Sequence, residues 1–335
     1  MKRHFIRRWF LLVLVLVIAG GFLAPRQLAP LVDHLWREAI VFGVLFLMAF
    51  SLDSRAMWQA MRRPGAAALA TAINFGLLPL VAWGFSLAMF KAGLLGRDLA
   101  IGLLIVGATP STLASGAVWT RRAGGNDAVA LLVTMITNLA CFVVTPLWLL
   151  WSTGQHASLD LPEMIGHLAV LVVLPMALAQ LLRAVRPLGR WATAQRTPLG
   201  VVAQCGVLTM ILIGAVNCGN KLSSGGGSAI GAGQWLAMLV AVASIHLLML
   251  YCGHLLGRAA SLPREDRIAV GFSGSQKTLM IGLQVAITYF AHLPLAMLPM
   301  VAYHVTQLIL DTAVADRLRR SGPQEASPRQ AGKSA

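Results

Sequence analysis

Charged residues are scarce in this 335-residue chain: Asp, Glu, Lys and Arg together make up 12% of it, whereas soluble domains carry about 25%. Hydrophobic residues make up 57%. They gather in uncharged stretches of about 20 residues, the length that an α-helix needs to cross a bilayer. The composition therefore excludes an ordinary soluble protein and predicts an all-α integral membrane protein.

Acidic residues and cysteines are also few. The chain has 12 Asp and Glu against 27 Lys and Arg, a net charge of +15, and four cysteines. The cysteines lie in or beside apolar stretches without the paired spacing of a metal site, so we interpret them as packing residues and expect no resident cofactor. The sequence has no phosphate-binding loop of the Walker type, which argues against direct use of ATP.

Ten stretches are long enough, or nearly so, to cross the membrane. They lie at residues 9–25, 39–52, 64–90, 99–120, 128–151, 164–182, 198–217, 234–256, 268–290 and 292–310. With the N-terminus inside, most Lys and Arg residues fall in the inner segments, as the positive-inside rule requires. We therefore predict a multi-pass protein of the cell (inner or plasma) membrane with both termini in the cytoplasm. The positive charge then contacts the head groups of the lipid bilayer and does not form a nucleic-acid-binding surface.

Two of these spans carry interruptions. The fourth contains Gly107–Gly116 with Pro110 near its centre, and the ninth contains Gly271–Thr278 with Lys277. Proline removes a backbone donor, and an ammonium in the middle of a membrane marks a functional site. Non-helical backbone at that depth survives only where protein buries it or where it lines a cavity. We predict that both helices break to build one site.

Each interruption lies in the fourth span of a set of five. Five is odd, so the two sets have opposite orientations, and inverted repeats with matching broken helices are typical of secondary transporters. We predict a first five-helix repeat over residues 1–155 and a second, inverted repeat over 156–316. A disordered cytoplasmic tail follows over 317–335.

Three segments resemble the bile acid:sodium symporter family. The first is Asn74-Phe75-Gly76-Leu77-Leu78-Pro79 in the third span, and the second is Thr109–Gly116, followed by Ala123–Asn126 and Thr134. The third, Gly274-Ser275-Gln276-Lys277-Thr278-Leu279, resembles a branch with a Gly-Ser-X-Lys-Thr signature in the ninth span. The resemblance covers about residues 5–315.

This resemblance implies ten helices in a five-plus-five inverted repeat, with two broken helices (spans four and nine) that cross beside two sodium sites. Spans one, two, six and seven would form a panel, and spans three to five and eight to ten a core. An organic anion, such as a bile acid or another amphipathic carboxylate or sulfonate, would bind between them. The candidate substrate-binding residues are Lys277, Gln276, Ser275, Thr278, Thr112, Ser115 and Asn138. The candidate residues of remnant sodium sites are Asn74, Ser115, Thr134 and Gln276.

The chain departs from the family pattern at the sodium sites. Phe272 stands where the family has a glutamate that links both sites, Gly116 replaces an asparagine, and Ala130 replaces a serine. Lys277 takes the place of an asparagine that faces the substrate. A lysine at about 4 Å would repel sodium by about 4 kcal/mol at an effective dielectric constant near 20. We therefore interpret Lys277 as a built-in cation and expect weak or no sodium coupling, with proton coupling or exchange in its place.

Other intramembrane polar residues have two interpretations each. Asn138 lines the site or makes an interhelical hydrogen bond. His246 and His304 are packing residues or members of a proton relay, and burial, which disfavours the charged form of an amine, makes Lys277 another candidate proton carrier. Asp311, at the inner end of the last span, is expected to pair with nearby arginines.

The leading functional hypothesis is a non-enzymatic secondary transporter of an organic anion, with sodium or a proton as the candidate coupling ion. In it Lys277, Gln276 and Thr112 contact the substrate. Two alternatives are a non-transporting membrane regulator that keeps the transporter fold, and an intramembrane hydrolase with Ser273 as nucleophile and Lys277 as base. The sequence leaves open the substrate's identity, the direction of transport and the oligomeric state.

Overall fold

The computed structural model describes residues 2–61, 64–113, 115–154, 160–223 and 230–321. These residues form helices and no strand, as the composition predicts. The elements before the ninth span are α1 (Lys2–Leu23), α2 (Pro25–Asp33), α3 (Arg37–Phe50), α4 (Ser54–Ala60), α5 (Pro64–Ala72), η1 (Ile73–Leu77), α6 (Leu78–Lys91), α7 (Arg97–Ala108), α8 (Gly116–Arg122), α9 (Asp127–Thr153), α10 (Leu161–Leu168), η2 (Ala169–Val173), α11 (Leu174–Ala184), α12 (Arg186–Ala194), α13 (Arg196–Ser223) and α14 (Ala232–Ala259). The rest are α15 (Arg264–Ser275), α16 (Leu279–Tyr289), η3 (Pro294–Met297) and α17 (Leu298–Arg320).

Five helical runs in the described residues are long and apolar enough to cross a membrane. They are Pro64–Lys91, Asp127–Thr153, Leu161–Ala184, Arg196–Ser223 and Ala232–Ala259. Two bent pairs are Leu12–Leu23 with Pro25–Asp33 and Arg37–Phe50 with Ser54–Ala60, and the number is seven if each pair is counted as one span. Spans four and nine are each divided into two helices of 7 to 12 residues, which are too short to be counted alone. A count of ten crossings and the inverted repeat therefore stay predictions.

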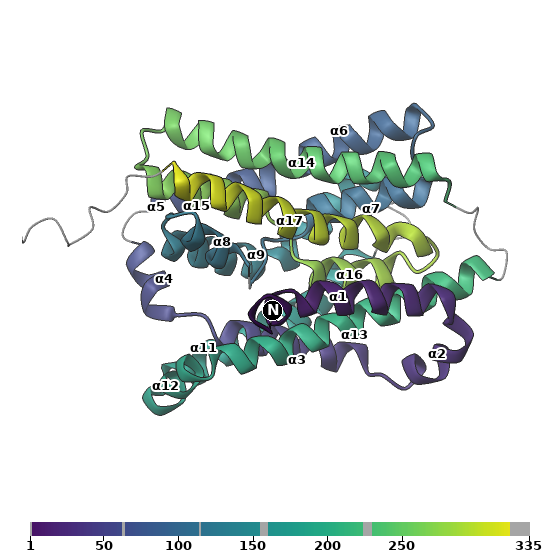
Figure 1. The fold of residues 1–335 in the computed structure, drawn as a ribbon, viewed down its shortest axis with the longest axis horizontal. Helices are drawn as coiled ribbons and strands as arrows, with labels where there is room; N and C mark the ends of the chain where they lie inside the picture. The colour runs from purple at the N-terminus through teal and green to yellow at the C-terminus, as the bar shows by residue number, and fades with distance from the viewer. Residues whose placement is uncertain (1, 62–63, 114, 155–159, 224–229, 322–335) are drawn as a thin grey trace, which may run out of the picture.

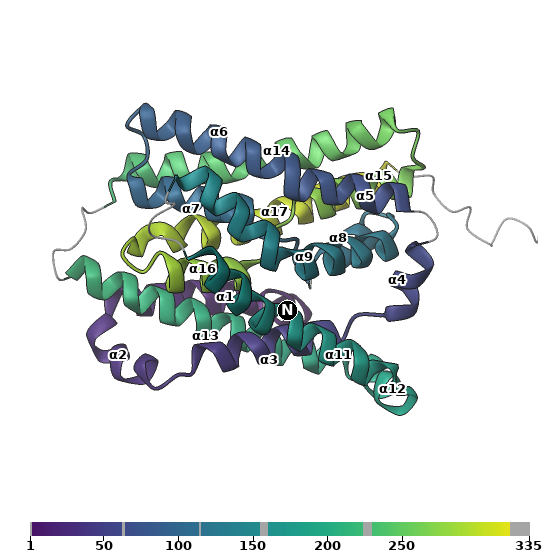
Figure 2. The ribbon, with the colours of Figure 1, turned by 180° about the vertical axis from the view of Figure 1, so that it is seen from behind.

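The helices gather in two groups that run roughly parallel to each other (Figures 1 and 2). The lower group of Figure 1 contains α1, α3, α11 and α13, and α13 packs against α1 and α3. The upper group contains α5 to α7, α14, α15 and α17, and α14 packs against α15 and α17. The half-helix α16 contacts both groups, through α13 and through α7. The seam between the groups therefore runs along α16.

The structure departs from the predicted boundaries at both ends of the chain. After α1 the chain turns by 106° and forms α2, which lies between the first two predicted spans. At the other end α17 continues to Arg320, four residues into the predicted tail. Three arginines in its last turn favour this extension, because cations stabilise a helix C-terminus. The remainder of that tail, 322–335, lies outside the described residues.

A π-helical turn, η1, interrupts the third span at Asn74 and Phe75. Leu78 N bonds the carbonyl of Ile73, five residues back, and Pro79, the next residue, has no N–H to donate. The carbonyls of Asn74 and Phe75 are therefore left without a helical partner. The indole Nε1 of Trp148, in α9, donates to Phe75 O at 2.7 Å. Asn74 O is available for a different donor.

This arrangement predicts a measurable role for Trp148. Trp148→Phe should lower the free energy of unfolding by about 1–3 kcal/mol, because Phe75 O would lose its donor in an apolar environment. Chemical unfolding in detergent micelles measures the change. Trp151→Phe is the matched control, since the Trp151 side chain is 53% exposed. Equal effects of the two substitutions would contradict the assignment.

Candidate functional site

The two helix breaks meet in the interior of the protein. The chain leaves α7 at Thr109 and α15 at Gln276, and both residues have extended backbone conformations. Thr278 N donates to Pro110 O at 2.9 Å, which joins the two breaks directly. This contact brings two segments together that are far apart in the sequence, as the matching interruptions predict.

The ammonium of Lys277 lies at this meeting point, and its side chain is 0% exposed. Nζ donates to three backbone carbonyls: Thr109 O at 2.6 Å, Gly107 O at 2.8 Å and Asn74 O at 2.8 Å. Asn74 Oδ1 lies at 3.3 Å, and the ring of Phe75 at 5.6 Å from Nζ. An ammonium has three protons to donate. The three carbonyls match that number, so the cation is solvated by the protein itself.

Each of these carbonyls lacks a backbone donor from its own helix for a physical reason. Asn74 O lost its helical donor at the π turn, and Gly107 O and Thr109 O lie at the C-terminal end of α7, where no further turn follows. The end of a helix also carries partial negative charge, which favours a cation. The break in span four and the π turn in span three thus create the oxygen environment that Lys277 occupies.

Two amide side chains hold the ninth-span break in place. Gln307, from α17, accepts from Lys277 N at 3.0 Å and donates to Lys277 O at 3.1 Å. Asn74 Nδ2 donates to the carbonyls of Ser273, Gly274 and Gln276 at 2.9–3.3 Å. Asn74 therefore caps α15 with its amide nitrogen while its oxygens face Lys277.

Residues of α9 satisfy the carbonyls of the fourth-span break. Thr145 Oγ1 donates to Ala108 O at 2.7 Å. Asn138 Nδ2 donates to Ser111 O at 2.8 Å, and Thr134 Oγ1 donates to Thr112 O at 3.1 Å. For Asn138 this is the interhelical hydrogen bond of the second interpretation; whether it also contacts a substrate stays a prediction.

The predicted substrate-binding residues lie together but are closed off from solvent. Gln276 and Ser275 are 0% exposed, and Thr112 and Thr278 are 5% exposed. Ser115 is half-buried, and its hydroxyl approaches Gln276 Oε1 at 3.5 Å. In this conformation these side chains stabilise the crossing of the breaks.

The residues beside Lys277 do not fit a sodium ion. The oxygens that would bind one already accept from the ammonium, and a second cation there would be repelled. On the other side of the break, Gln276 Oε1 and Thr134 Oγ1 lie 3.1 and 3.8 Å from the position of a side-chain carbon at Gly116. These oxygens are neutral, so the remnant set lacks the charge that would offset a buried cation.

A buried carboxylate is nevertheless present, and it comes from an unexpected helix. Asp311, in α17, is 0% exposed; its Oδ1 lies 2.8 Å from His246 Nε2, and its Oδ2 accepts from Gln276 Nε2. Our expectation that Asp311 pairs with arginines at a helix end is wrong, because α17 extends past it to Arg320 and Asp311 lies in the protein interior. Phe272, where the family has its glutamate, is 1% exposed and packs against Ile268 and Ala315.

His246 and His304 differ in their surroundings. His246, in α14, contacts Asp311, and its Nδ1 lies 3.3 Å from Ser275 O, which also accepts from Tyr303 Oη at 2.6 Å. His304 Nδ1 lies 3.1 Å from Gln307 Nε2, and the imidazole ring is packed edge-on against Phe10. His246 therefore contacts residues at the crossing of the two helix breaks, whereas His304 contacts Gln307, which in turn bonds the backbone of Lys277.

Gln307 and Tyr303 were not predicted from the sequence as site residues, and Asp311 was predicted at a different place. The sequence contains a pattern that identifies all three as possible site residues. Tyr303, Gln307 and Asp311 recur every four residues and so share one face of the last span. A polar stripe in an otherwise apolar span predicts a buried polar partner.

The hydrolase alternative fails on geometry. Helix α15 ends at Ser275, so Ser273 and Lys277 do not share a helical turn. Ser273 Oγ is buried and has no hydrogen-bond partner among the described residues, while the Lys277 ammonium is bonded to carbonyls. A serine without a base is not an activated nucleophile.

Comparisons with known proteins found matches over most of the chain. The profile of the SBF-like CPA transporter family matches residues 8–320. Sodium/bile acid cotransporter 7-A of Xenopus laevis is 24% identical over 322 residues, which cover 93% of this chain and 92% of that protein. Sodium/bile acid cotransporter 7 of Rattus norvegicus is 24% identical over 323 residues, 93% of each chain. These relatives are named as transporters and not as enzymes.

Proposed function

Because the chain belongs to the SBF-like CPA transporter family, we propose that it is a secondary transporter of an amphipathic organic anion that does not depend on sodium. In this proposal the ammonium of Lys277 permanently takes the place of a coupling cation. The observation that carries it is the set of three backbone carbonyls that accept from Nζ within 2.8 Å.

The names of the relatives associate sodium and bile acids with those proteins. A bile-acid-like carboxylate or sulfonate is therefore the substrate class that we propose here. We do not extend the association with sodium to this chain. Lys277 donates to the oxygens on one side of the break, and Asp311 accepts from two N–H groups on the other.

Proton coupling or exchange would then drive the cycle. The pair of His246 and Asp311 is the group that we propose to carry the proton, because it lies beside Gln276 and thereby touches the break. Protonation of either member would weaken or rearrange the contact to Gln276 and so favour one arrangement of the crossing over another.

Uptake into proteoliposomes tests the proposal. We expect uptake of radiolabelled taurocholate to proceed equally with sodium or potassium in the medium, and to increase when an inward proton gradient is imposed. The membrane potential is clamped so that only the chemical gradient changes. Steep, saturable activation by sodium at constant pH would contradict sodium independence. Absence of uptake of every amphipathic anion tried would favour the non-transporting regulator.

A further inference from the structure

A short helix, α12, projects from the lower helix group at the end of the molecule where α17 ends (Figures 1 and 2). Its nine residues span about 14 Å at 1.5 Å per residue, less than half the thickness of the hydrocarbon core of a bilayer. The positive-inside pattern predicts that this end of the molecule faces the cytoplasm. We therefore expect α12 to lie at the inner surface of the membrane and not to cross it.

One side of α12 is strongly basic. Residues 183–196 contain four arginines and no acidic residue. Arg186 and Arg190 are one turn apart, so they share a face of the helix, and both are exposed. Neither forms an ion pair within the part of the chain that the structure describes. Asp53, an acidic residue near this end, interacts electrostatically with Arg183. The two exposed arginines therefore present positive charge to an anion outside the protein.

A second side of α12 is apolar. Leu188 lies about 160° around the helix axis from both arginines, and Trp191 is three residues further along on the same side. Their side chains are 39% and 52% exposed, although the ring of Trp191 lies 6.2 Å from that of Phe50. A helix with cations on one side and Trp and Leu on another is typical of segments that lie in the plane of a membrane interface.

Contacts with the lower group cover a third side of α12. Arg183, near the end of α11, donates to Phe50 O and to Thr193 Oγ1, each at 2.8 Å. Gly189 lets α12 approach α11 closely, since a side-chain carbon at that position would lie 2.5 Å from Arg183 O. Ala192, on the same side as Gly189, is buried. These contacts fix the orientation of α12 and leave its basic and apolar sides for another partner.

We propose that α12 is a binding site for anionic phospholipids of the inner leaflet. In this arrangement Leu188 and Trp191 contact the acyl chains, and the guanidinium groups of Arg186 and Arg190 bind the phosphate groups. A guanidinium can donate two parallel hydrogen bonds to a phosphate, and the negative surface potential of an anionic leaflet attracts basic segments beside the membrane. A free phosphate would contact only the basic side of α12, whereas a lipid matches both sides at once.

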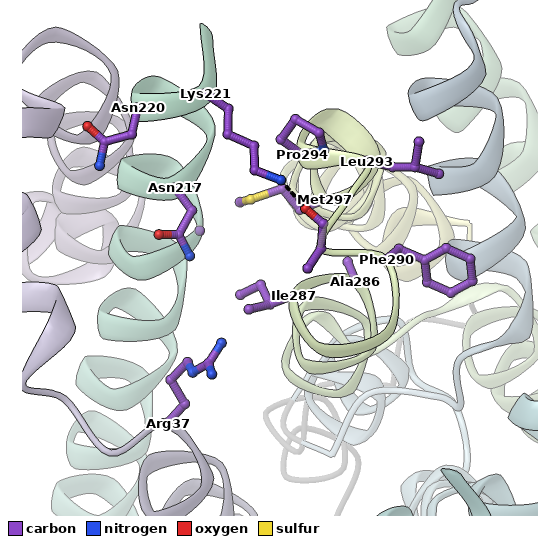
Figure 3. Close-up of a pocket in the computed structure, with 12 residues that line it drawn as sticks. Arg37, Asn217, Asn220, Lys221, Ala286, Ile287, Phe290, Leu293, Pro294 and Met297 are labelled. Atoms are coloured by element: carbon purple, nitrogen blue, oxygen red, sulfur yellow. Dashed lines mark hydrogen bonds between the residues drawn. The ribbon is translucent and has the colours of Figure 1, made fainter. Parts of the chain in front are cut away.

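A single long helix connects α12 to the seam between the helix groups. Only Gln195 separates α12 from α13, which has 28 residues and is long enough to cross the membrane. Near the far end of α13, Lys221 Nζ donates to Ala291 O, in the turn that follows α16 (Figure 3). A lipid that holds α12 at the interface therefore restrains the helix that meets this turn at the seam. A change in transport rate with anionic lipid is a consequence that rests on the proposed function, whereas the lipid binding itself does not.

Native mass spectrometry of the full chain tests the lipid specificity, in micelles with equal amounts of phosphatidylglycerol and phosphatidylcholine. The variant R186Q/R190Q should bind phosphatidylglycerol about tenfold or more weakly than the wild type, as expected for the loss of two basic residues at a lipid surface. Its binding of phosphatidylcholine should be unchanged. The matched control R258Q/R317Q removes two exposed arginines at the same end of the molecule, from α14 and α17, and should change the affinity less than about twofold. Equal weakening in both variants would overturn the proposal, since general surface charge would then explain the binding.

Tryptophan fluorescence tests the position of the apolar side independently. The chain has nine tryptophans, so the contribution of Trp191 is taken as the difference between the wild type and Trp191→Phe. In phosphatidylcholine vesicles, phosphatidylglycerol with brominated acyl chains should quench this contribution more strongly than equally brominated phosphatidylcholine does. R186Q/R190Q should lose that preference and keep the wild-type melting temperature. A contribution that neither brominated lipid quenches would place Trp191 in water and overturn the proposal, whether or not the protein transports an anion.

Discussion

Lys277→Ala should abolish anion transport in sodium-free medium, and sodium should restore part of what is lost. The substitution leaves the carbonyls of Asn74, Gly107 and Thr109 without a donor. A buried acceptor that loses its partner costs about 1–3 kcal/mol, so we expect the free energy of unfolding to fall by about 3 kcal/mol or more. The vacated oxygens resemble a sodium site, and a cation that binds only the folded state stabilises it.

The melting temperature in detergent measures this effect directly. Sodium should raise the melting temperature of Lys277→Ala, whereas choline should not, and the wild type should respond to neither. Lys91→Ala, at an exposed position, is the control. Equal stabilisation of wild type and variant by sodium would contradict the interpretation of Lys277 as a replacement cation, as would wild-type uptake by the variant.

Asp311→Ala should be the most destabilising substitution in α17. Removal of a buried acceptor costs about 1–3 kcal/mol for each donor that is left without a partner in an apolar environment. Here His246 Nε2 and Gln276 Nε2 would both lose their acceptor. Chemical unfolding in detergent micelles measures the loss, and a double-mutant cycle with His246→Ala isolates the coupling between the two side chains.

The same helix offers a control for this experiment. Asp316 forms an ion pair with Arg122 of α8 at 2.7 Å, and the two side chains are 41% and 34% exposed. Pairs as exposed as this one contribute little to stability, so Asp316→Ala should have a much smaller effect than Asp311→Ala. If the two substitutions destabilise equally, the Asp311 carboxylate does not have the role that the geometry assigns to it.

The sequence predicts the breaks but not the partners that stabilise them. Pro110 and Lys277 are visible in the sequence because each breaks a local rule: one removes a backbone donor, and the other places a charge in an apolar span. The exposure of Lys277 and its partners depend on how spans three, four and nine pack, which no local pattern specifies. We expected an uncompensated cation facing a substrate, whereas the ammonium is bonded to three carbonyls.

Asp311 shows why the sequence reasoning went wrong at one position. The inference that the crossing lacks a carboxylate followed from Phe272 alone, which compares the chain with its family position by position. A carboxylate reaches the same region from α17, a helix at a different place in the sequence. Position-by-position reasoning cannot detect a carboxylate that reaches the site from another helix, since only the three-dimensional packing brings Asp311 to Gln276.

A cation that is covalently part of the chain has an electrical consequence. A mobile sodium ion would cross with each molecule of substrate and neutralise it, but the Lys277 ammonium returns with the protein, so it contributes no net charge per cycle. Inward movement of a monoanion would then carry one negative charge against an inside-negative voltage, at a cost of about 2.3 kcal/mol per 100 mV. The voltage alone would drive the anion out of the cell. Net accumulation would require at least one proton with each anion, or exchange for another anion.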